Sequence, residues 1–430
     1  MTPAKRIAIA VLAAIAVAMA AALTLGLRED AGSPPTPAAG NPSELVARGA
    51  YLARAGDCQA CHTARGGAPY AGGRAIRTPF GAIHSSNITP DRETGIGGWS
   101  ADDFWRALHN GKSKDGTLLY PAFPYPNYTR VTRADSDAMY AYFRTLAPVR
   151  QANREPDLRF PFNIRILLAG WRALYFRPGE YAADASHDAE WNRGAYLVQG
   201  LGHCNACHTP RNAFGATQEK ADLSGAMIPM LDWHAASLTG GSEAGLRKWE
   251  TQDVVDLLKT GVSMRGAASG PMAEVVRESL QHLSDADLRA MAVYLKSLPS
   301  SGSTESDDPY PAHDPANEKT LKLGASLYEK HCVDCHKPSG EGVPPDYPAL
   351  AGNRAVTLSS PVNPIRAVLH GGYPPSTQGN PRPYGMPPFA ALLSDAEAAA
   401  VVSYIRNAWG NHASMVAADQ VNRYRAVSVN

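Results

Sequence analysis

The chain has 430 residues, of which 41 are Lys or Arg and 40 are Asp or Glu, so its formal net charge is only +1. This near-neutral balance argues against nucleic acid as a partner, because phosphate binding requires an excess of basic residues. Roughly 400 residues follow the first apolar segment, enough for two or three domains by length alone. Helical patterns recur and alternating strand-like runs are few, so we predict a mostly α-helical protein.

The first element is an apolar segment at the N-terminus. Lys5 and Arg6 precede an uncharged run, residues 7–27, that is long enough to span a membrane as a helix. The small residues 18–20 also fit a signal-peptide cleavage site, but the segment stays apolar beyond them, so we favour an uncleaved anchor. The basic residues stay inside, which places the rest of the chain on the periplasmic face of a bacterial inner membrane.

Three Cys-x-x-Cys-His motifs contain every cysteine of the chain. They are Cys58-Gln59-Ala60-Cys61-His62, Cys204-Asn205-Ala206-Cys207-His208 and Cys332-Val333-Asp334-Cys335-His336. This signature is the attachment site of a c-type haem. The two thiols bond covalently to the porphyrin, and the adjacent histidine becomes an axial ligand of the iron. We therefore predict three covalently bound haem c groups.

Other uses of paired cysteines fit this pattern poorly. A structural zinc site needs four ligands, usually two spaced pairs, and each pair here stands alone. A thioredoxin-like pair belongs in a βαβ setting and would not repeat three times. Disulfides at this spacing would be strained and would leave the histidine after each pair unexplained.

Similar helices flank each haem motif. The preceding helices include residues 48–52, 193–197 and 323–328. The closing helices span residues 135–146, 284–298 and 394–409. Each first helix contains a glycine and each closing helix an aromatic residue, which together suit a close helix crossing, so each motif defines one module.

The predicted fold is all-α, with three tandem class I cytochrome c domains after an N-terminal hydrophobic segment. The expected order is a signal or anchor helix (1–28), a flexible tether (29–43), domain 1 (44–150), a connector with a packed helix at 160–176 (151–188), domain 2 (189–299), a flexible linker (300–317), domain 3 (318–411) and a tail (412–430).

The second axial ligand decides whether a haem only carries electrons or also binds other molecules. A thioether sulfur there closes the site and raises the reduction potential. In domain 3 the candidate is Met386, in a proline-rich loop before the closing helix. Met272 occupies the same slot in domain 2, with Met264 as a rival further from the closing helix.

Domain 1 departs from this pattern, because Phe123 stands where the sulfur is expected and cannot bind iron. Its haem is therefore ligated by another residue or left open. Met139 lies inside the closing helix among core-like neighbours, His84 is in a loop, and His109 occupies a slot that we expect to be solvated. The ligand is not settled by these residues.

Further polar residues lie near the motifs. His203 and His331 directly precede a motif cysteine, on the turn that already supplies the proximal ligand, so we interpret them as exposed or as neighbours of ligands. Arg74, Arg211 and Arg354 are candidate partners for haem propionates, because carboxylates favour charge-assisted donors.

The chain resembles the tri-haem cytochrome c subunits of bacterial membrane-bound dehydrogenases, which serve alcohol, gluconate and sorbitol oxidoreductases, and the cytochrome subunits of nicotinate dehydrogenase-type molybdenum hydroxylases. The resemblance covers most of the chain after the leader. The matching segments are residues 78–81, 87–91, 94–97 with Trp99, 207–211 and 292–299. Members often carry Met at the position of Phe123, so the ligand that the family uses for its first haem is not assigned to this chain. Alcohol and gluconate members attach through C-terminal segments, whereas this chain ends in a short polar tail.

The resemblance implies a role as an electron relay. A partner dehydrogenase catalytic subunit, either flavin- or quinone-dependent or a molybdenum hydroxylase, would pass electrons to one haem, and the chain would pass them to ubiquinone or a terminal oxidase. No substrate pocket is evident in the sequence, so we expect no catalytic site of its own. Two alternatives remain: a free periplasmic electron shuttle, which requires leader cleavage, and a peroxidase-like haem enzyme that uses an open haem 1.

Overall fold

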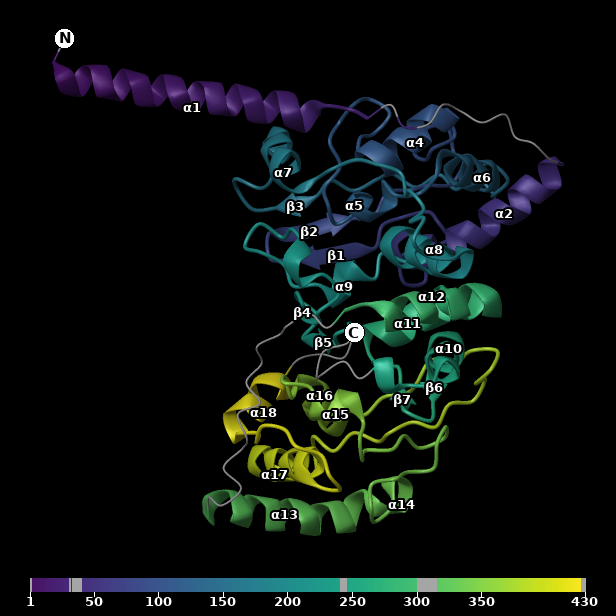
Figure 1. Ribbon diagram of the computed structural model, residues 1–430, viewed down its shortest axis with the longest axis vertical. Coiled ribbons are helices and arrows are strands. Elements are labelled where there is room, and N and C mark those ends of the chain that lie inside the picture. The colour runs from purple at the N-terminus through teal and green to yellow at the C-terminus, as the bar shows by residue number, and fades with distance from the viewer. Residues whose placement is uncertain (1, 31, 33–40, 240–245, 300–314, 427–430) are drawn as a thin grey trace. The chain divides into compact units, whose positions relative to one another are not determined.

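The computed structural model describes residues 2–30, 32, 41–239, 246–299 and 315–426 (Figure 1). The prediction of a mostly helical chain with an apolar helix at its N-terminus is confirmed. The chain divides into two compact units. Unit 1 comprises Met1–Ala185, Tyr196–His203 and Asn212–Ala216, and unit 2 comprises Ser186–Ala195, Cys204–Arg211 and Thr217–Asn430. The second haem motif, Cys204–His208, thus lies in unit 2, whereas the turn before it belongs to unit 1.

Unit 1 combines helices with a small antiparallel sheet. The helices are α1 (Pro3–Leu27), α2 (Pro42–Ala55), α3 (Cys58–His62), α4 (Ala101–Asn110), α5 (Tyr125–Tyr128), α6 (Arg133–Phe143), η1 (Arg165–Leu167) and α7 (Leu168–Tyr175), and the π-helical turn η2 (Leu197–Leu201) follows. The strands β1 (Ala75–Thr78), β2 (Gly81–His84) and β3 (Asp157–Leu158) pair antiparallel in that order.

Unit 2 holds the remaining elements. Its helices are α8 (Ala189–Tyr196, whose last residue lies in unit 1), α9 (Asn205–His208), η3 (Glu219–Ala221), η4 (Leu246–Lys248), α10 (Thr251–Thr260), α11 (Pro271–Glu278), η5 (Leu280–His282), α12 (Asp285–Ser297), α13 (Pro315–His331), α14 (Val333–His336), α15 (Arg354–Thr357), α16 (Val362–His370), α17 (Asp395–Asn407) and α18 (Ala418–Arg425). The antiparallel hairpins pair β4 (Ala226–Ile228) with β5 (Trp233–Ala235), and β6 (Val262–Ser263) with β7 (Gly266–Ala267).

The closing helices begin at side-chain caps that the sequence encodes. The Thr132 side chain accepts a hydrogen bond from the backbone of α6, and Ser284 does the same for α12. Ser394 forms a reciprocal capping box with Glu397 at the start of α17. These caps satisfy first-turn N–H groups that otherwise have no partner, and they fix where each closing helix starts.

A glycine lets each first helix cross its closing helix at backbone contact. In all three places an added Cβ would overlap a carbonyl oxygen of the closing helix and would come within 3 Å of the Cβ of its aromatic residue. The three sets are Gly49 with Ala138 and Tyr142, Gly194 with Ala290 and Tyr294, and Gly324 with Ala400 and Tyr404. In Figure 1, α13 and α17 lie side by side at the last of these crossings.

Around the third crossing lies an apolar core. It is built mainly by α16 and α17, with Ile365, Leu369 and Val402 almost completely buried. The helix α18 packs on this core through the fully buried Val421. The sequence had indicated only a polar tail here, since one apolar side chain in an otherwise polar segment gives little helical periodicity.

The end of α1 is packed against α7. Gly26 lies on the backbone of Ala169, and the Arg172 guanidinium donates to the carbonyl of Gly26 at 2.7 Å. Two residues that we had placed in a tether are also bonded to this unit. Asp30 bonds to His109 on α4, and Glu29 bonds to Lys112 just after α4. Residues 31 and 33–40 of that tether lie outside the described part of the chain, as do residues 300–314 of the predicted linker.

Candidate haem-attachment sites

Each haem motif forms a short helix of its own: α3, α9 and α14. The six cysteines are all partly buried. Burial raises the pKa of Cys58 and of Cys204 to about 12 and that of Cys332 to about 11. These three thiols are therefore protonated at neutral pH.

The motif histidines share one hydrogen bond. The Nδ1 atom of His62 lies 2.7 Å from the carbonyl oxygen of Ser86, that of His208 lies 2.6 Å from Ala236, and that of His336 lies 3.0 Å from Pro348. A carbonyl can only accept, so Nδ1 carries the proton and Nε2 keeps its lone pair. A partner on the far ring nitrogen also fixes the ring orientation, as is usual for histidines that bind metals.

Burial also keeps these imidazoles neutral. Desolvation lowers the pKa of His62 and of His336 below the ordinary value. For His208 desolvation acts together with the nearby charge of Arg354, and the pKa falls to about 4. A neutral ring with an available Nε2 is the form that can bind iron.

The donor set at each motif fits a c-type haem. Two thiols and one oriented imidazole are supplied within five residues, and the three sites are alike in this respect. Among the described residues no group of three or more His, Cys, Asp or Glu side chains is placed to hold a bare metal ion.

Arginine side chains brace the first two motifs in the same way. Arg74 donates to the carbonyl of Ala60 at 2.6 Å, and Arg211 donates to that of Ala206 at 2.8 Å. Both alanines directly precede the second motif cysteine. Arg354 differs, because its guanidinium donates to Ser237, next to the carbonyl that orients His208. Whether any of these arginines also binds a propionate stays a prediction.

Met386 packs against the same apolar core as the third haem motif. Its side chain and that of Cys332 both pack against the core of α16 and α17. Two backbone hydrogen bonds with Gly372, at 2.8 and 3.0 Å, hold the loop that carries it. The predicted ligand thus lies on a loop that is held by backbone hydrogen bonds. Its bond to iron stays a prediction.

Met272 sits in the first turn of α11, not in a loop as the comparison with Met386 suggested. The cause is Pro271, whose fixed φ suits the first position of a helix. Met272 is partly buried, whereas its rival Met264 is 59% exposed at the tip of the β6–β7 hairpin. Burial therefore favours Met272 as the candidate.

In the predicted domain 1 the loop that we expect to correspond to that of Met386 holds an aromatic cluster. The ring of Phe123 is partly buried and lies 5.2 Å from that of Tyr128. Met139 is 1% exposed inside α6, in keeping with its predicted place in the core. His84 ends strand β2, and its buried Nδ1 has no hydrogen-bond partner among the described residues.

The prediction that His109 is solvated was wrong, because the side chain is completely buried. Its Nδ1 faces the carbonyl of Thr129 at 2.9 Å, its Nε2 lies 2.8 Å from the Asp30 carboxylate, and its ring stacks on Trp105. The segment after α1 folds back over this slot and covers it. Both ring nitrogens are thus engaged, which argues against His109 as an iron ligand.

The turn before the second motif lies against the first motif within unit 1. Tyr128 donates its hydroxyl hydrogen to the carbonyl of Gly56 at 2.8 Å, and its ring lies 5.6 Å from that of His203. Asn127 donates to the carbonyl of Gln199 at 2.8 Å. Neither the tyrosine nor the asparagine was singled out from the sequence, since only the fold brings the two turns together.

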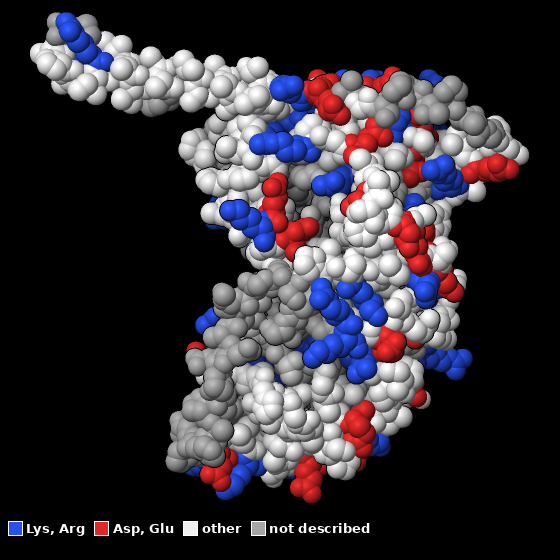
Figure 2. All heavy atoms as spheres, in the orientation of Figure 1, with Lys and Arg blue, Asp and Glu red and all other residues white. Residues whose placement is uncertain are grey.

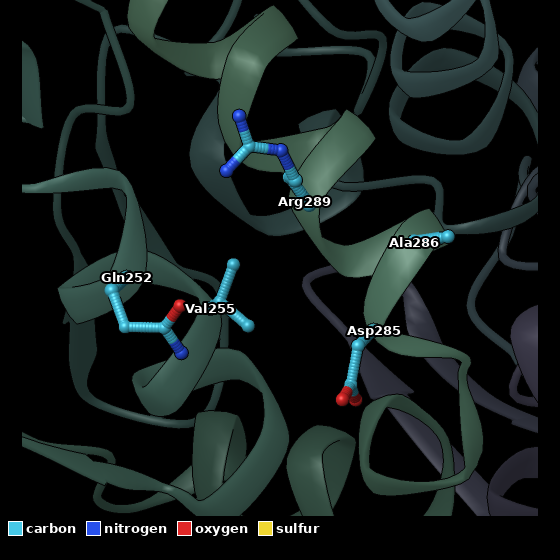
Figure 3. Close-up of a pocket in the computed structure, with 5 residues that line it drawn as sticks. All are labelled: Gln252, Val255, Asp285, Ala286 and Arg289. Carbon is cyan, nitrogen blue, oxygen red and sulfur yellow. The ribbon is translucent and has the colours of Figure 1, made fainter.

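A shallow hollow lies between α10 and α12 (Figure 3). Five residues line it: Gln252, Val255, Asp285, Ala286 and Arg289. Asp285 forms an ion pair with Lys259 at 3.3 Å, and Arg289 forms one with Glu190 at 3.0 Å. Both charged groups of the lining are therefore used in surface ion pairs, and the five side chains supply no nucleophile with an adjacent base.

Comparisons with known proteins agree with this chemistry. A family model described as Cytochrome c matches residues 321–409. The chain is 43% identical over 391 residues to the gluconate 2-dehydrogenase cytochrome c subunit of Pantoea cypripedii, covering 86% of each chain. It is 42% identical to the cytochrome c subunit of the alcohol dehydrogenase (quinone) of Gluconobacter oxydans, covering 89% of this chain and 82% of the relative. It is 41% identical to a nicotinate dehydrogenase subunit of Pseudomonas putida, covering 88% of this chain but 32% of that longer protein.

The fold and the haem-attachment motifs define a c-type cytochrome, a haem protein of electron transfer. More narrowly, the chain belongs to the family of cytochrome c subunits of bacterial dehydrogenases. The resemblance inferred from the sequence is thereby confirmed.

Proposed function

We propose that this chain is a three-haem electron relay that accepts electrons from a dehydrogenase catalytic subunit and delivers them to ubiquinone or another component of the respiratory chain. The observation that carries the proposal is the threefold recurrence of one arrangement. Each motif supplies two thiols and a histidine oriented by a backbone carbonyl, at His62, His208 and His336. Each motif follows, along the chain, a helix that crosses its closing helix at a glycine, in the same way at Gly49, Gly194 and Gly324. These three modules are best explained as three tandem class I cytochrome c domains.

Haem c supplies one-electron exchange between ferric and ferrous iron. A substrate oxidation that releases two electrons thus loads the chain in two single-electron steps. Reduction of one ubiquinone to ubiquinol consumes those two electrons and two protons from water. The residues that would bind the haem irons are His62, His208 and His336, together with Met272 and Met386 as the proposed thioether ligands.

The partner is proposed from the relatives. Their names include cytochrome subunits of a gluconate dehydrogenase and of a quinone alcohol dehydrogenase, and a subunit of a nicotinate dehydrogenase. A catalytic subunit that is flavin- or quinone-dependent, or a molybdenum hydroxylase, is therefore the expected electron donor. In the nicotinate relative, the part that this chain matches makes up 32% of a longer protein.

We place the protein on the periplasmic face of a bacterial inner membrane, held by α1. This helix is 25 residues long, with a mean hydropathy of 2.6 over its most apolar window. Figure 2 shows it as an uncharged rod with basic side chains only at its free end, where Lys5 and Arg6 lie. Length and composition support an anchor, and a signal sequence would meet the same criteria, so cleavage must be tested directly.

The testing experiment is isolation of the C-terminally tagged chain from its native membranes. We expect three haems per chain, intact α1 by mass spectrometry, and a dehydrogenase in stoichiometric amount. A flavin- or quinone-dependent enzyme points to sugar or alcohol substrates, and a molybdenum hydroxylase points to N-heterocycles or aldehydes. Fewer than three haems, or no stoichiometric dehydrogenase, would overturn the relay.

One observation favours a second function, a peroxidase-like activity at haem 1. Phe123 replaces the expected sulfur, and the buried Nδ1 of His84 has no hydrogen-bond partner within the described part of the chain. An open haem beside an acid–base residue could reduce peroxide. A ferric spectrum that is low-spin for all three haems excludes this activity, whereas a high-spin component with peroxide turnover supports it. A free shuttle is tested by whether the full-length chain stays in washed membranes.

A further inference from the structure

The connector between the first two modules exposes several large apolar side chains, although it buries an arginine. Six large apolar side chains on it are exposed, and we call them the connector patch. They are Phe160 (79% exposed), Phe162 (40%), Ile164 (40%), Ile166 (52%), Leu167 (53%) and Leu174 (68%). A run of exposed apolar side chains this dense marks an interaction site, because single exposed residues are ordinary but clusters are not.

Two arginines within the patch, Arg165 and Arg172, point inwards, whereas Arg159 and Arg177 at its two ends are exposed. Arg172 on α7 is only 2% exposed, although Leu174, two residues later, is 68% exposed. Arg165 donates to the carbonyl of Leu118 at 3.0 Å, and its guanidinium lies 4.6 Å from the centre of the Tyr120 ring. A helix that faces water would place these residues the other way round, so the outer face of the connector is suited to an apolar environment.

The buried Arg172 joins this segment to α1. Its guanidinium donates to the carbonyls of Gly26, at 2.7 Å, and of Asn110, and Lys112 donates to the carbonyl of Leu27 at 2.7 Å. The last carbonyls of α1, which have no partner inside the helix, are thus held by two cations of unit 1. The close contact of Gly26 with Ala169 leaves no room for a side chain between α1 and α7, which lie next to each other in Figure 1.

The dimensions of α1 place α7 at a defined depth. Residues 7–27, the uncharged part, extend about 31 Å at 1.5 Å per residue. This matches the hydrocarbon thickness of about 30 Å. With Lys5 and Arg6 at the cytoplasmic interface, Gly26 lies at the opposite edge of the hydrocarbon. The packed α7 then lies in the interface, where Trp171, which donates to the carbonyl of Phe214 at 3.0 Å, also belongs.

We propose that the connector patch is a second membrane contact, inserted into the periplasmic leaflet beside α1, which holds unit 1 on the bilayer surface. The proposal rests on the proposed role of α1 as an anchor. The occupant of the patch is lipid. A bilayer would cover the six apolar side chains to the depth of about 5–10 Å that interfacial helices reach.

The test uses the full-length chain with its haems, reconstituted into phosphatidylglycerol–phosphatidylethanolamine vesicles. If three haems are attached, all six native cysteines are in thioether bonds, so an introduced cysteine is the only free thiol. A nitroxide label is placed by L174C on the patch, by V11C in α1 and by L323C, which replaces a 43% exposed leucine on α13. The collision rates of each label with oxygen and with a water-soluble nickel chelate report its environment.

We expect oxygen collisions to exceed nickel collisions several-fold at residues 174 and 11, with the reverse ratio at residue 323. If the label at residue 174 is in water while the label at residue 11 is in lipid, the connector contact is overturned, but the proposal that α1 is an anchor is not. Removal of α1, if mass spectrometry shows it, overturns the anchor and with it the contact beside α1, whatever the environment of the label at 174. If the label at 174 is shielded only after the dehydrogenase is added, the patch binds protein and the proposal fails. Labelling of the unsubstituted chain would show free native thiols and overturn the three-haem assignment.

Discussion

Gly49 lies so close to Ala138 that a Cβ on residue 49 would overlap the Ala138 carbonyl oxygen. The helices α2 and α6 therefore cross at backbone contact in the middle of α2, upstream of the first haem motif, which starts at Cys58. The same relationship joins Gly194 to Ala290 and Gly324 to Ala400. Any larger residue must push the two helices apart, and the chain that carries the motif would move with them.

Replacing this glycine should therefore destabilise the first module. We expect Gly49→Ala to lower the free energy of unfolding by about 1–3 kcal/mol, the usual cost of overfilling a packed contact. The measurement is denaturant unfolding of the haem-loaded chain, followed by circular dichroism and Soret absorbance. The matched control is Gly170→Ala, since Gly170 lies on α7 with no atom near its missing Cβ. An alanine there should be neutral or stabilising, because glycine is a poor helix former. Equal effects of the two variants would contradict the argument.

A basic residue follows each closing-helix aromatic, and the copies in domains 1 and 3 differ in burial. Arg406 is completely buried and donates to the carbonyls of Val356, at 2.7 Å, and Leu358, at 2.8 Å. Its counterpart Arg144 is exposed and donates to Gly97 at 2.6 Å. We expect Arg406→Met to cost on the order of 3 kcal/mol, because it leaves buried carbonyls without donors.

The control variant is Arg144→Met, whose cost should stay within about 0.5 kcal/mol, as for most surface substitutions. Thermal unfolding of the two variants, followed at the Soret band, makes the comparison. A small effect of Arg406→Met would mean that other donors or water replace the guanidinium.

The proposed thioether ligands can be tested one at a time. Met386→Ala and Met272→Ala should each remove one sulfur-to-iron charge-transfer band from the ferric spectrum and lower the reduction potential of one haem, because a thioether ligand raises it. Met264→Ala should change neither property, since its side chain is 59% exposed. Redox titration with optical detection gives both readouts. A changed potential in Met264→Ala with an unchanged one in Met272→Ala would reverse the assignment.

Much of this organisation could be predicted from the sequence because it depends on side-chain type. The cysteines, the motif histidines and the glycines opposite Tyr142 and Tyr294 all left a repeated pattern in the chain. Backbone partners left none: the carbonyls of Ser86, Ala236 and Pro348 orient the histidines, and any residue type could supply a carbonyl.

The burial of His109 was missed for a related reason. Its slot in the repeat also holds Lys259 and His370, polar residues that suggest solvent. All three side chains in fact bond to backbone carbonyls, those of Thr129, Leu283 and Tyr424. Asp30, in the segment after α1, additionally covers His109. These two residues are 79 positions apart, so no local sequence pattern predicts their contact.

The ligand of the predicted first haem tests whether the loop that contains Phe123 corresponds to the loop that contains Met386. Phe123 is partly buried against Tyr128, in the loop that corresponds to that of Met386 in domain 3. A methionine is unbranched and flexible, so it fits such a space without large strain. We expect Phe123→Met to add one methionine-to-iron band to the spectrum and to raise the reduction potential of one haem.

The control for that experiment is Phe162→Met, which changes a 40% exposed phenylalanine on the connector and should add no band. If wild-type haem 1 has a high-spin component, Phe123→Met should abolish it together with any peroxide turnover. The absence of a new band would mean that another side chain already holds the sixth position. His84 would then be the residue to replace next, because its buried Nδ1 has no hydrogen-bond partner in the described ranges of the chain.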